Sequence, residues 1–306
     1  MTERVTDRFS DKERFTFPGY MERVTSGVGG ESFLVFGGEK TALYDCGMAY
    51  SQAGLIRNIE EKIAERGYGG LDYVLLSHTH YDHIGALPYI IKRWPSVKVC
   101  GAEKALKVFK SEGAAATMVK LGESARDRYA VSEEEKSCEI TADGLRCDIV
   151  MHEGDTVDLG DMTVRAYETK GHTDCSLTYM LEPVMTMLAS ESTGVLRSDG
   201  KMYTAILKSF AQTIESAEKC RALKPKLIIG NHFGRIPDEV TEKYFDLYIE
   251  AATEERDFIL AMKERGLSHI EMIKEYEKVY WTAERAKSQP KEAFYENANW
   301  IIKNMA

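Results

Sequence analysis

Histidine and aspartate side chains are concentrated in one short segment of this 306-residue chain, the run HTHYDH at positions 78–83. Imidazole nitrogens and carboxylate oxygens are ligands by which proteins hold zinc and iron. In an extended segment His78 and His80 point the same way, because side chains alternate along the chain. Asp82 and His83 then follow the turn of the chain, at the start of a helix. The run can therefore offer two pairs of ligands to two neighbouring metal ions.

Two further histidines occur in a similar context. His172 follows the strand-like run MTVRAYE, and His232 follows the run KLIIG, each with a glycine close by. Together with HTHYDH, five of the seven histidines come after predicted strands, which favours a shared site over unrelated surface or core histidines. His152 and His269 lack this context, and we expect a loop histidine and a helix-surface histidine at these positions.

The elements that must position these residues can be predicted from hydrophobic periodicity. The run LDYVLLS, which ends at HTHYDH, is typical of a buried strand, and α/β folds place their sites at the carboxyl ends of strands. Residues 53–66 and 205–223 have helical spacing. Further strands are predicted in the runs ESFLVF, KTALYD, VKVCG, MTVRAYE, SLTYMLE, VMTMLAS and, as the last strand, KLIIG.

The remaining segments divide the chain. Residues 1–18 are polar and predict an arm, and helical spacing extends over about 102–137. After Gly234, glycine and proline become rare, and aromatic and charged residues alternate at helical spacing. We therefore predict a catalytic domain over residues 1–236, with a helical insertion near 102–137. About three C-terminal helices over 237–306 are expected to cover the site.

Composition narrows the class of protein. A chain that is 43% hydrophobic and 29% charged is typical of globular proteins, and its net charge of −9 argues against nucleic acid or an anionic membrane as a partner. No apolar run approaches the roughly 20 residues of a transmembrane helix, and the charged N-terminus is unlike a secretory signal. Six cysteines without a CxxC pair predict reduced thiols. These features favour a cytoplasmic protein that acts on a small molecule. They leave open whether it forms a homodimer.

The spacing of these residues resembles that of the metallo-β-lactamase-fold hydrolases. The family's HxHxDH signature corresponds to residues 78–83, its later Gly-His motif to Gly171-His172, and its last histidine to His232. The Asp-x-Gly turn that precedes the signature corresponds to Asp45-Cys46-Gly47. Over residues 20–235 the resemblance implies an α/β fold, namely an αββα sandwich of two mixed sheets with helices outside. It also implies a dinuclear metal site at one edge and an Asp45 that orients a ligand histidine.

The same resemblance assigns ligands to two divalent metal ions, which the N/O donors leave open as Zn, Fe or Mn. Glu191 stands where the family has an aspartate that bridges the metals, so either Glu191 bridges or it is a solvated loop carboxylate and the second metal is weakened. Asp82 and Glu191 are also the implied catalytic residues. The implied ligands are His78, His80 and His172 for one metal, Asp82, His83 and His232 for the other, and Glu191 for both.

A narrower resemblance is to the quinolone signal response protein group. It is carried by the run LLSHTHYDHIGALPYIIKRWPSVKV, by the helical segment after it and by the C-terminal helices. This group comprises metallo-β-lactamase-fold thioesterases that act on 2-aminobenzoylacetyl-coenzyme A, with an iron-containing site beneath C-terminal helices. The resemblance therefore implies a thioesterase or esterase.

Hydrolysis is the chemistry that such a site predicts. Two cations that share a water molecule lower its pKa toward about 7 and so supply hydroxide for attack on a small ester or thioester. The alternative is a non-hydrolytic metal-binding protein of the same fold, either an oxygenase or a regulatory binder, and Glu191 is the feature that favours it. We also expect the segments 102–137 and 237–306 to wall the metal cleft into a mostly apolar pocket.

Overall fold

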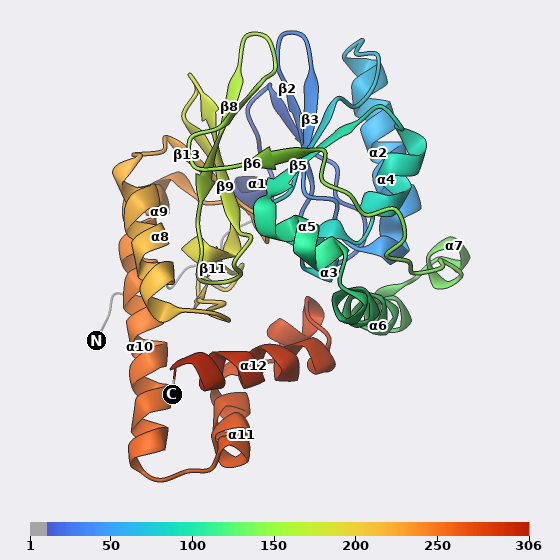
Figure 1. The fold of residues 1–306 in the computed structure, drawn as a ribbon. Coiled ribbons are helices and arrows are strands. Elements are labelled where there is room, and N and C mark those ends of the chain that lie inside the picture. Colours follow the sequence, from blue (N-terminus) through green and yellow to red (C-terminus); the bar gives the residue numbers. More distant parts are fainter. Residues whose placement is uncertain (1–10, 306) are drawn as a thin grey trace.

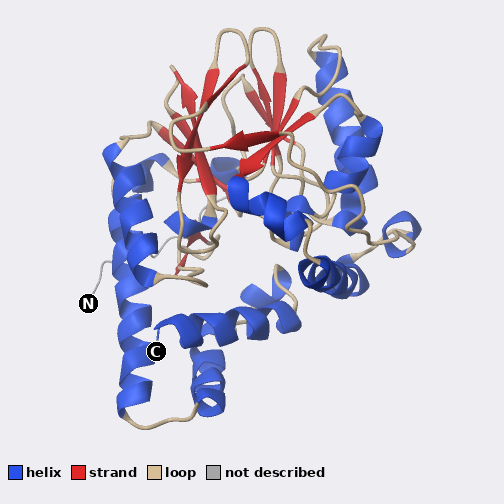
Figure 2. Ribbon diagram, in the orientation of Figure 1, coloured by secondary structure: helices blue, strands red, loops and turns tan. Residues whose placement is uncertain are grey.

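Two six-stranded sheets pack face to face in the computed structural model, which describes residues 11–305, and helices cover their outer faces (Figures 1 and 2). The first sheet has the order β1 (Met21–Arg23), β2 (Phe33–Phe36), β3 (Thr41–Tyr44), β4 (Tyr73–Leu75), β5 (Lys98–Ala102), β6 (Ile149–Met151). The second has the order β14 (Gly234–Arg235), β13 (Leu227–Gly230), β10 (Thr186–Ala189), β9 (Leu177–Glu182), β8 (Thr163–Glu168), β7 (Thr156–Asp158). This arrangement confirms the predicted αββα sandwich.

The helices follow the strands that they connect. In the first half of the chain they are α1 (Asp11–Arg14), α2 (Gln52–Glu65), α3 (Tyr81–Ile84), α4 (Leu87–Arg93), α5 (Glu103–Phe109), α6 (Glu112–Tyr129) and α7 (Glu133–Lys136). In the second half they are α8 (Phe210–Ala222), α9 (Asp238–Thr241), α10 (Tyr244–Glu264), α11 (His269–Tyr280) and α12 (Lys291–Met305). A two-stranded sheet of β11 (Val195–Leu196) and β12 (Met202–Tyr203) precedes α8.

Strand direction brings several strand ends to one edge. In the first sheet β3, β4, β5 and β6 are parallel neighbours. In the second sheet β10 is parallel to β13, and β9 is antiparallel to both β8 and β10, so β8, β10 and β13 run the same way. The segments that follow β8, β10 and β13 therefore leave the sheet at a common edge.

Apolar side chains from both sheets fill the space between them. Phe33 and Leu75 of the first sheet join Tyr179, Leu188 and Ile229 of the second in one buried cluster. Burial of such side chains is the main favourable contribution to folding, at about 25 cal/mol per Å² of apolar surface. This core holds the loops at the sheet edge on a rigid base.

The C-terminal helices have a hydrophobic cluster of their own. Ile259 of α10, Met272 and Tyr276 of α11, and Phe294 and Ile301 of α12 pack together. A capping box formed by Ser268 and Glu271 begins α11. In Figure 1, α10 descends beside the second sheet, and α12 lies beneath the sandwich, with its first turn near α6 and its C-terminal end near α10. Among residues 11–305, no helix is long and apolar enough to cross a membrane.

One predicted helix boundary is wrong, and two other segments contain elements that the sequence did not predict. The helix expected over residues 205–223 begins only at Phe210, because Ser209 caps it by accepting a hydrogen bond from the backbone N–H of Gln212. KLIIG is not the last strand, since β14 pairs with β13 after a tight turn. The predicted N-terminal arm contains α1, whose Arg14 is buried, while residues 1–10 lie outside the described range.

Candidate metal centre

The loop after β4 carries four of the predicted ligands on a fixed backbone. Asp45, directly after β3, has φ of +53°, a backbone conformation that few residues other than glycine adopt. Its carboxylate accepts hydrogen bonds from the backbone N–H of Ser77 at 2.7 Å and the Ser77 hydroxyl at 2.6 Å. It also accepts from His83 Nδ1 at 2.9 Å, which leaves His83 Nε2 to face the site. The contact that the resemblance implied for Asp45 is therefore present.

The second sheet contributes the other three predicted ligands. His172 follows β8, Glu191 follows β10, and His232 lies in the turn between β13 and β14. Gly171 has φ of +129°, and a Cβ at this position would lie 2.0 Å from Thr213 Oγ1, so only glycine fits before His172. His172 Nδ1 donates to the carbonyl of Ala205 at 2.6 Å, so Nε2 faces the site.

One group of ligand atoms comes from His78, His80, His172 and Glu191. His172 Nε2 lies 3.3 Å from His78 Nε2 and 3.0 Å from His80 Nδ1. Glu191 Oε1 lies 3.5 Å from His78 Nε2 and 3.6 Å from His172 Nε2. Four donor atoms from both sheets thus surround one point.

A second group comes from Asp82, His83 and His232. The Nε2 atoms of His83 and His232 are 3.1 Å apart, and each lies 3.6 Å from Asp82 Oδ2. Glu191 Oε1 is 3.1 Å from His83 Nε2 and 3.2 Å from His232 Nε2. The same glutamate oxygen therefore contacts both groups.

Glu191 is not the solvated loop carboxylate of the alternative interpretation. Its residue is only 5% exposed. Burial alone would raise the pKa of this carboxyl, but the nearby imidazoles of His172 and His232 hold it well below its usual range. Glu191 is therefore a buried anion, in agreement with a ligand role.

The imidazoles differ in protonation. Burial, together with the neighbouring imidazoles, lowers the pKa of His78 well below its ordinary value and that of His80 to about 3. Both rings are therefore neutral at pH 7 and present lone pairs. Burial acts in the same direction on His83, but the carboxylates of Asp82 and Asp45 outweigh it and raise the pKa of that ring.

These distances fit divalent cations. Metal–nitrogen bonds of about 2.0–2.1 Å in a tetrahedron place neighbouring ligand atoms about 3.4 Å apart. The separations between ligand atoms given above, 3.0–3.6 Å, lie around this value, and all atoms of a group lie within 4.8 Å of one another. The Nδ1 atoms of His78 and His172 are engaged by the Ser77 hydroxyl and the Ala205 carbonyl, so the Nε2 lone pairs of these two rings face each other across 3.3 Å. A cation explains this arrangement, because two lone pairs cannot form a hydrogen bond with each other.

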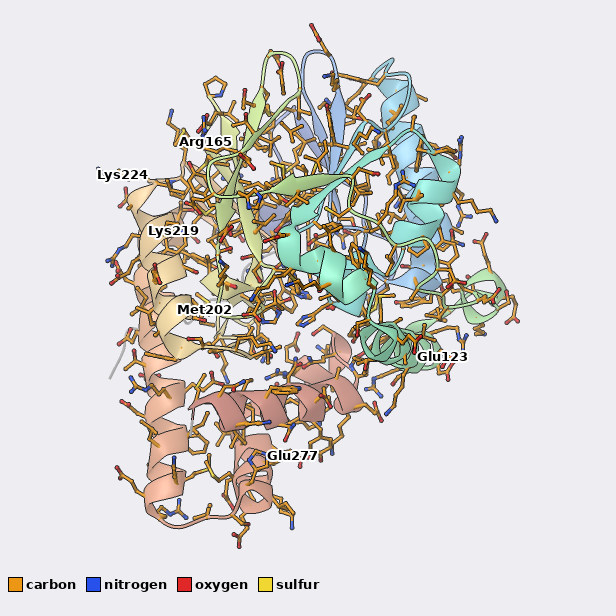
Figure 3. The ribbon with its side chains drawn as sticks, viewed as in Figure 1. Glu123, Arg165, Met202, Lys219, Lys224 and Glu277 are labelled. Atoms are coloured by element: carbon orange, nitrogen blue, oxygen red, sulfur yellow. The ribbon has the colours of Figure 1, made fainter. Side chains whose placement is uncertain are left out.

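A cavity of about 240 Å³ opens from the ligand groups. His80, Asp82, His172, Glu191 and His232 line its inner end. Thr117 and Leu121 of α6 and Ala293, Asn297 and Trp300 of α12 line its walls. Residues of both helical segments, 102–137 and 237–306, therefore lie along the cavity, and Figure 3 shows side chains between α12 and the sandwich.

Sequence reasoning missed the polar residues of this cavity. Arg197, Tyr203, Arg285 and Gln289 all line it. None lies in a motif, and only the docking of β12 and of the segment before α12 brings them to the ligands. The expectations for His152 and His269 agree with the structure, since both side chains are exposed.

The chain belongs to the metallo-beta-lactamase superfamily, because the model of that family matches residues 26–181, about half of the chain. The metallo-beta-lactamase family protein from Thermus thermophilus has a TM-score of 0.58 at 16% identity, over 81% of this chain and 84% of that one. An archaeal superfamily member from Sulfolobus tokodaii has a TM-score of 0.55 at 20% identity, over 74% and 84%. These likenesses show the fold.

Curated relatives match over short stretches. A hydroxyacylglutathione hydrolase from Legionella pneumophila is 61% identical over 28 residues, 9% of this chain and 11% of that protein. A putative diflavin flavoprotein from a Synechocystis species is 31% identical over 97 residues, 32% of this chain and 16% of that protein. The chain thus spans less than a fifth of the length of either relative.

Proposed function

We propose that this chain is a metal-dependent hydrolase of small thioesters or esters. The observation that carries the proposal is the position of Glu191 Oε1, which lies 3.1 Å from His83 Nε2 in one ligand group and 3.5 Å from His78 Nε2 in the other. A shared carboxylate oxygen suits two neighbouring cations, and the cavity gives a small substrate access to them.

Two resemblances support a thioester as the bond that is cleaved. The name of the hydroxyacylglutathione hydrolase describes release of an acyl group from the thiol of glutathione. The run LLSHTHYDHIGALPYIIKRWPSVKV and the C-terminal helices resemble the quinolone signal response group, whose members are thioesterases. A cytoplasmic acyl-thioester is therefore the substrate class that we propose.

The residues of the site have different roles in the proposed reaction. Two bound cations, whether Zn, Fe or Mn, would supply hydroxide at neutral pH and polarise the carbonyl oxygen of the substrate. The neutral imidazoles of His78 and His80 provide lone pairs, and the carboxylates of Asp82 and Glu191 offset the positive charge of the site. Asp45 holds His83 in one orientation through the Nδ1 hydrogen bond.

Metal analysis combined with a substrate panel tests the proposal. The full chain, purified without chelator and reconstituted separately with Zn²⁺, Fe²⁺ and Mn²⁺, should bind about two metals per chain. It should hydrolyse at least one acyl thioester faster than matched lactones and phosphodiesters. His78→Ala should lose both metal and turnover.

His152→Ala is the matched control, since its imidazole is exposed and belongs to neither ligand group. This variant should keep wild-type metal content and turnover. A chain that stays metal-free on reconstitution would contradict the metal centre. A chain that binds two metals but cleaves no member of the panel would instead favour the non-hydrolytic oxygenase or regulatory binder.

A further inference from the structure

Arg285 is a buried cation in the wall of the cavity. It begins a short 3-10 turn, Arg285–Lys287, between α11 and α12, and is only 6% exposed. Its guanidinium carbon lies 4.0 Å from the ring centroid of Tyr203 and 4.8 Å from that of Phe294. Nε donates to Gln289 Oε1 at 2.8 Å, whereas Nη2 has no hydrogen-bond partner.

The carboxylates near Arg285 do not neutralise its positive charge. Arg197, which lines the same cavity and is 9% exposed, is paired with Asp199 at 3.0 Å. Within residues 11–305 no carboxylate forms an ion pair with Arg285. Glu255 interacts electrostatically with Arg285 but forms no ion pair with it. Its carboxylate accepts hydrogen bonds from Thr204 and Tyr276, and burial raises its pKa, which weakens it as a counter-ion.

The other acidic residues of the cavity have separate roles. Asp82 and Glu191 belong to the ligand groups at the inner end. Glu296 is exposed at the wall and accepts a hydrogen bond from Trp300 Nε1 at 2.9 Å. The interior wall therefore carries one guanidinium without a carboxylate of its own.

Such a group is a recognition site for a carboxylate. Burial of a guanidinium without a counter-ion is unfavourable in free energy, so the binding of an anion beside it is favourable. Its N–H donors form a planar fork that matches the two oxygens of a carboxylate. The amide nitrogen of Gln289 can add a donor on the same side, because its oxygen is already engaged by Arg285 Nε.

We propose that the cavity selects acyl groups that end in a carboxylate, and that Arg285 binds that carboxylate while the scissile carbonyl lies at the ligand groups. The proposal rests on the proposed function, because it names the substrate class of the same site. It predicts half-thioesters of dicarboxylic acids as substrates and dicarboxylates as products.

Matched thioesters provide the kinetic test. Succinyl, glutaryl and adipyl thioesters of N-acetylcysteamine are compared with the butyryl, valeryl and hexanoyl thioesters, using the full metal-loaded chain. At one chain length, kcat/KM for the carboxylated substrate should exceed that of its neutral partner about tenfold to a hundredfold, as expected for a hydrogen-bonded charge pair. Equal values at every length would overturn the proposal.

Arg285→Met should remove this preference, so that the carboxylated and the neutral thioester of one chain length have kcat/KM values within about twofold of each other. Arg128→Met is the matched control, since Arg128 Nη2 donates to the Ala286 carbonyl beside Arg285 but does not line the cavity. That variant should keep the preference. Loss of the preference in Arg128→Met as well would show that the segment, and not the guanidinium of Arg285, decides it.

Gln289→Glu tests the same idea without removing the cation. The new carboxylate would lie where Gln289 Oε1 already contacts Arg285 Nε at 2.8 Å, and so would act as an internal counter-ion. This variant should fold at least as stably as wild type and lose most of the preference for carboxylated substrates. An unchanged preference would overturn the proposal even if Arg285→Met fails to fold.

Direct binding separates this proposal from the proposed function. Titration calorimetry of the metal-loaded chain should give tighter binding of the best dicarboxylate among succinate, glutarate and adipate than of its monocarboxylate partner. Arg285→Met should abolish the difference. Dicarboxylate-selective binding without hydrolysis would contradict the proposed function but not the carboxylate site. Hydrolysis without any carboxylate preference would contradict the carboxylate site but not the proposed function.

Discussion

Glu191 differs from the aspartate that the resemblance leads one to expect by one methylene group, and its surroundings accommodate that group. It begins the 3-10 helix Glu191–Thr193, directly after β10. From this position Oε1 reaches both His83 and His232, at 3.1 Å and 3.2 Å. The longer side chain thus keeps its carboxylate between the two ligand groups.

We expect Glu191→Gln to lower metal content and turnover together. The amide has the same shape as the carboxylate but lacks the negative charge that the cations require. Glu191→Asp keeps the charge and should retain more metal than Glu191→Gln. Elemental analysis of the purified variants, with melting temperatures to verify folding, measures this. Wild-type metal content in Glu191→Gln would make the residue a bystander.

Some residues of the site could be predicted from the sequence and others could not. The ligands at positions 78–83 are contiguous, and His172 and His232 follow recognisable strands, so their convergence could be predicted. Ala286, Lys287 and Ser288 separate Arg285 from Gln289, and neither Arg285 nor Gln289 lies in a motif. Its isolation depends on which side chains pack around it, and this information is absent from local patterns.

Among the elements, the four-residue helix α1 has a large effect on the site. Arg14 at the end of α1 is only 1% exposed. Its Nε donates to the Phe233 carbonyl at 2.6 Å and its Nη2 to the Leu196 carbonyl at 2.5 Å. Gly234 has φ of +76°, and a Cβ there would lie 2.5 Å from the Arg14 carbonyl oxygen. Arg14 therefore stabilises the turn that carries His232.

Removing this side chain should weaken the fold. Burial lowers the pKa of Arg14 to about 10, so the guanidinium is still charged at neutral pH and its donors are needed by buried carbonyls. Arg14→Met should reduce the free energy of unfolding by about 3 kcal/mol. Urea denaturation of the metal-loaded chain measures the change.

Lys12→Met is the control on the same helix, because Lys12 is exposed, and it should alter stability by less than about 0.5 kcal/mol. A similar loss in both variants would mean that α1 as a whole, and not the Arg14 guanidinium, holds the turn.

Element prediction succeeded where patterns are long and failed where they are short. Apolar runs such as LDYVLLS and KLIIG, and the periodic segment at 53–66, predicted β4, β13 and α2. β11 and β12 have two residues each, which is too short for any period to be visible. The segment 205–209 has helical composition, but Ala205 has φ of +51° and uses its carbonyl to orient His172.

At the scale of the whole molecule, both ligand groups join the two sheets. His78 and His80 come from the first sheet and His172 from the second, and Asp82 and His83 face His232 in the same way. The sandwich could be predicted because its strands and site motifs resemble a known family. The place of α12 beneath the sheets could not, since it depends on contacts among distant helices.

Removal of metal should therefore destabilise the entire sandwich. A ligand that binds only the folded state contributes about 2.7 kcal/mol when its concentration is a hundred times its dissociation constant. We expect chelation to lower the melting temperature by about 5 °C or more. Differential scanning calorimetry with and without chelator measures this. The shift should persist in His152→Ala and vanish in His78→Ala, and its absence in wild type would contradict a cation between the sheets.

The walls of the cavity and the ligand groups lie on separate parts of the chain. The ligands occupy loops at the edge of two packed sheets, whereas Leu121 belongs to α6 and Ala293 and Trp300 belong to α12, outside both sheets. Substitutions in these helices leave the strand-end loops unchanged. Under the proposed function, selection can therefore alter which acyl group fits the cavity without changing the residues that would hold the metals. Relatives that share these seven residues are then expected to differ in substrate before they differ in reaction.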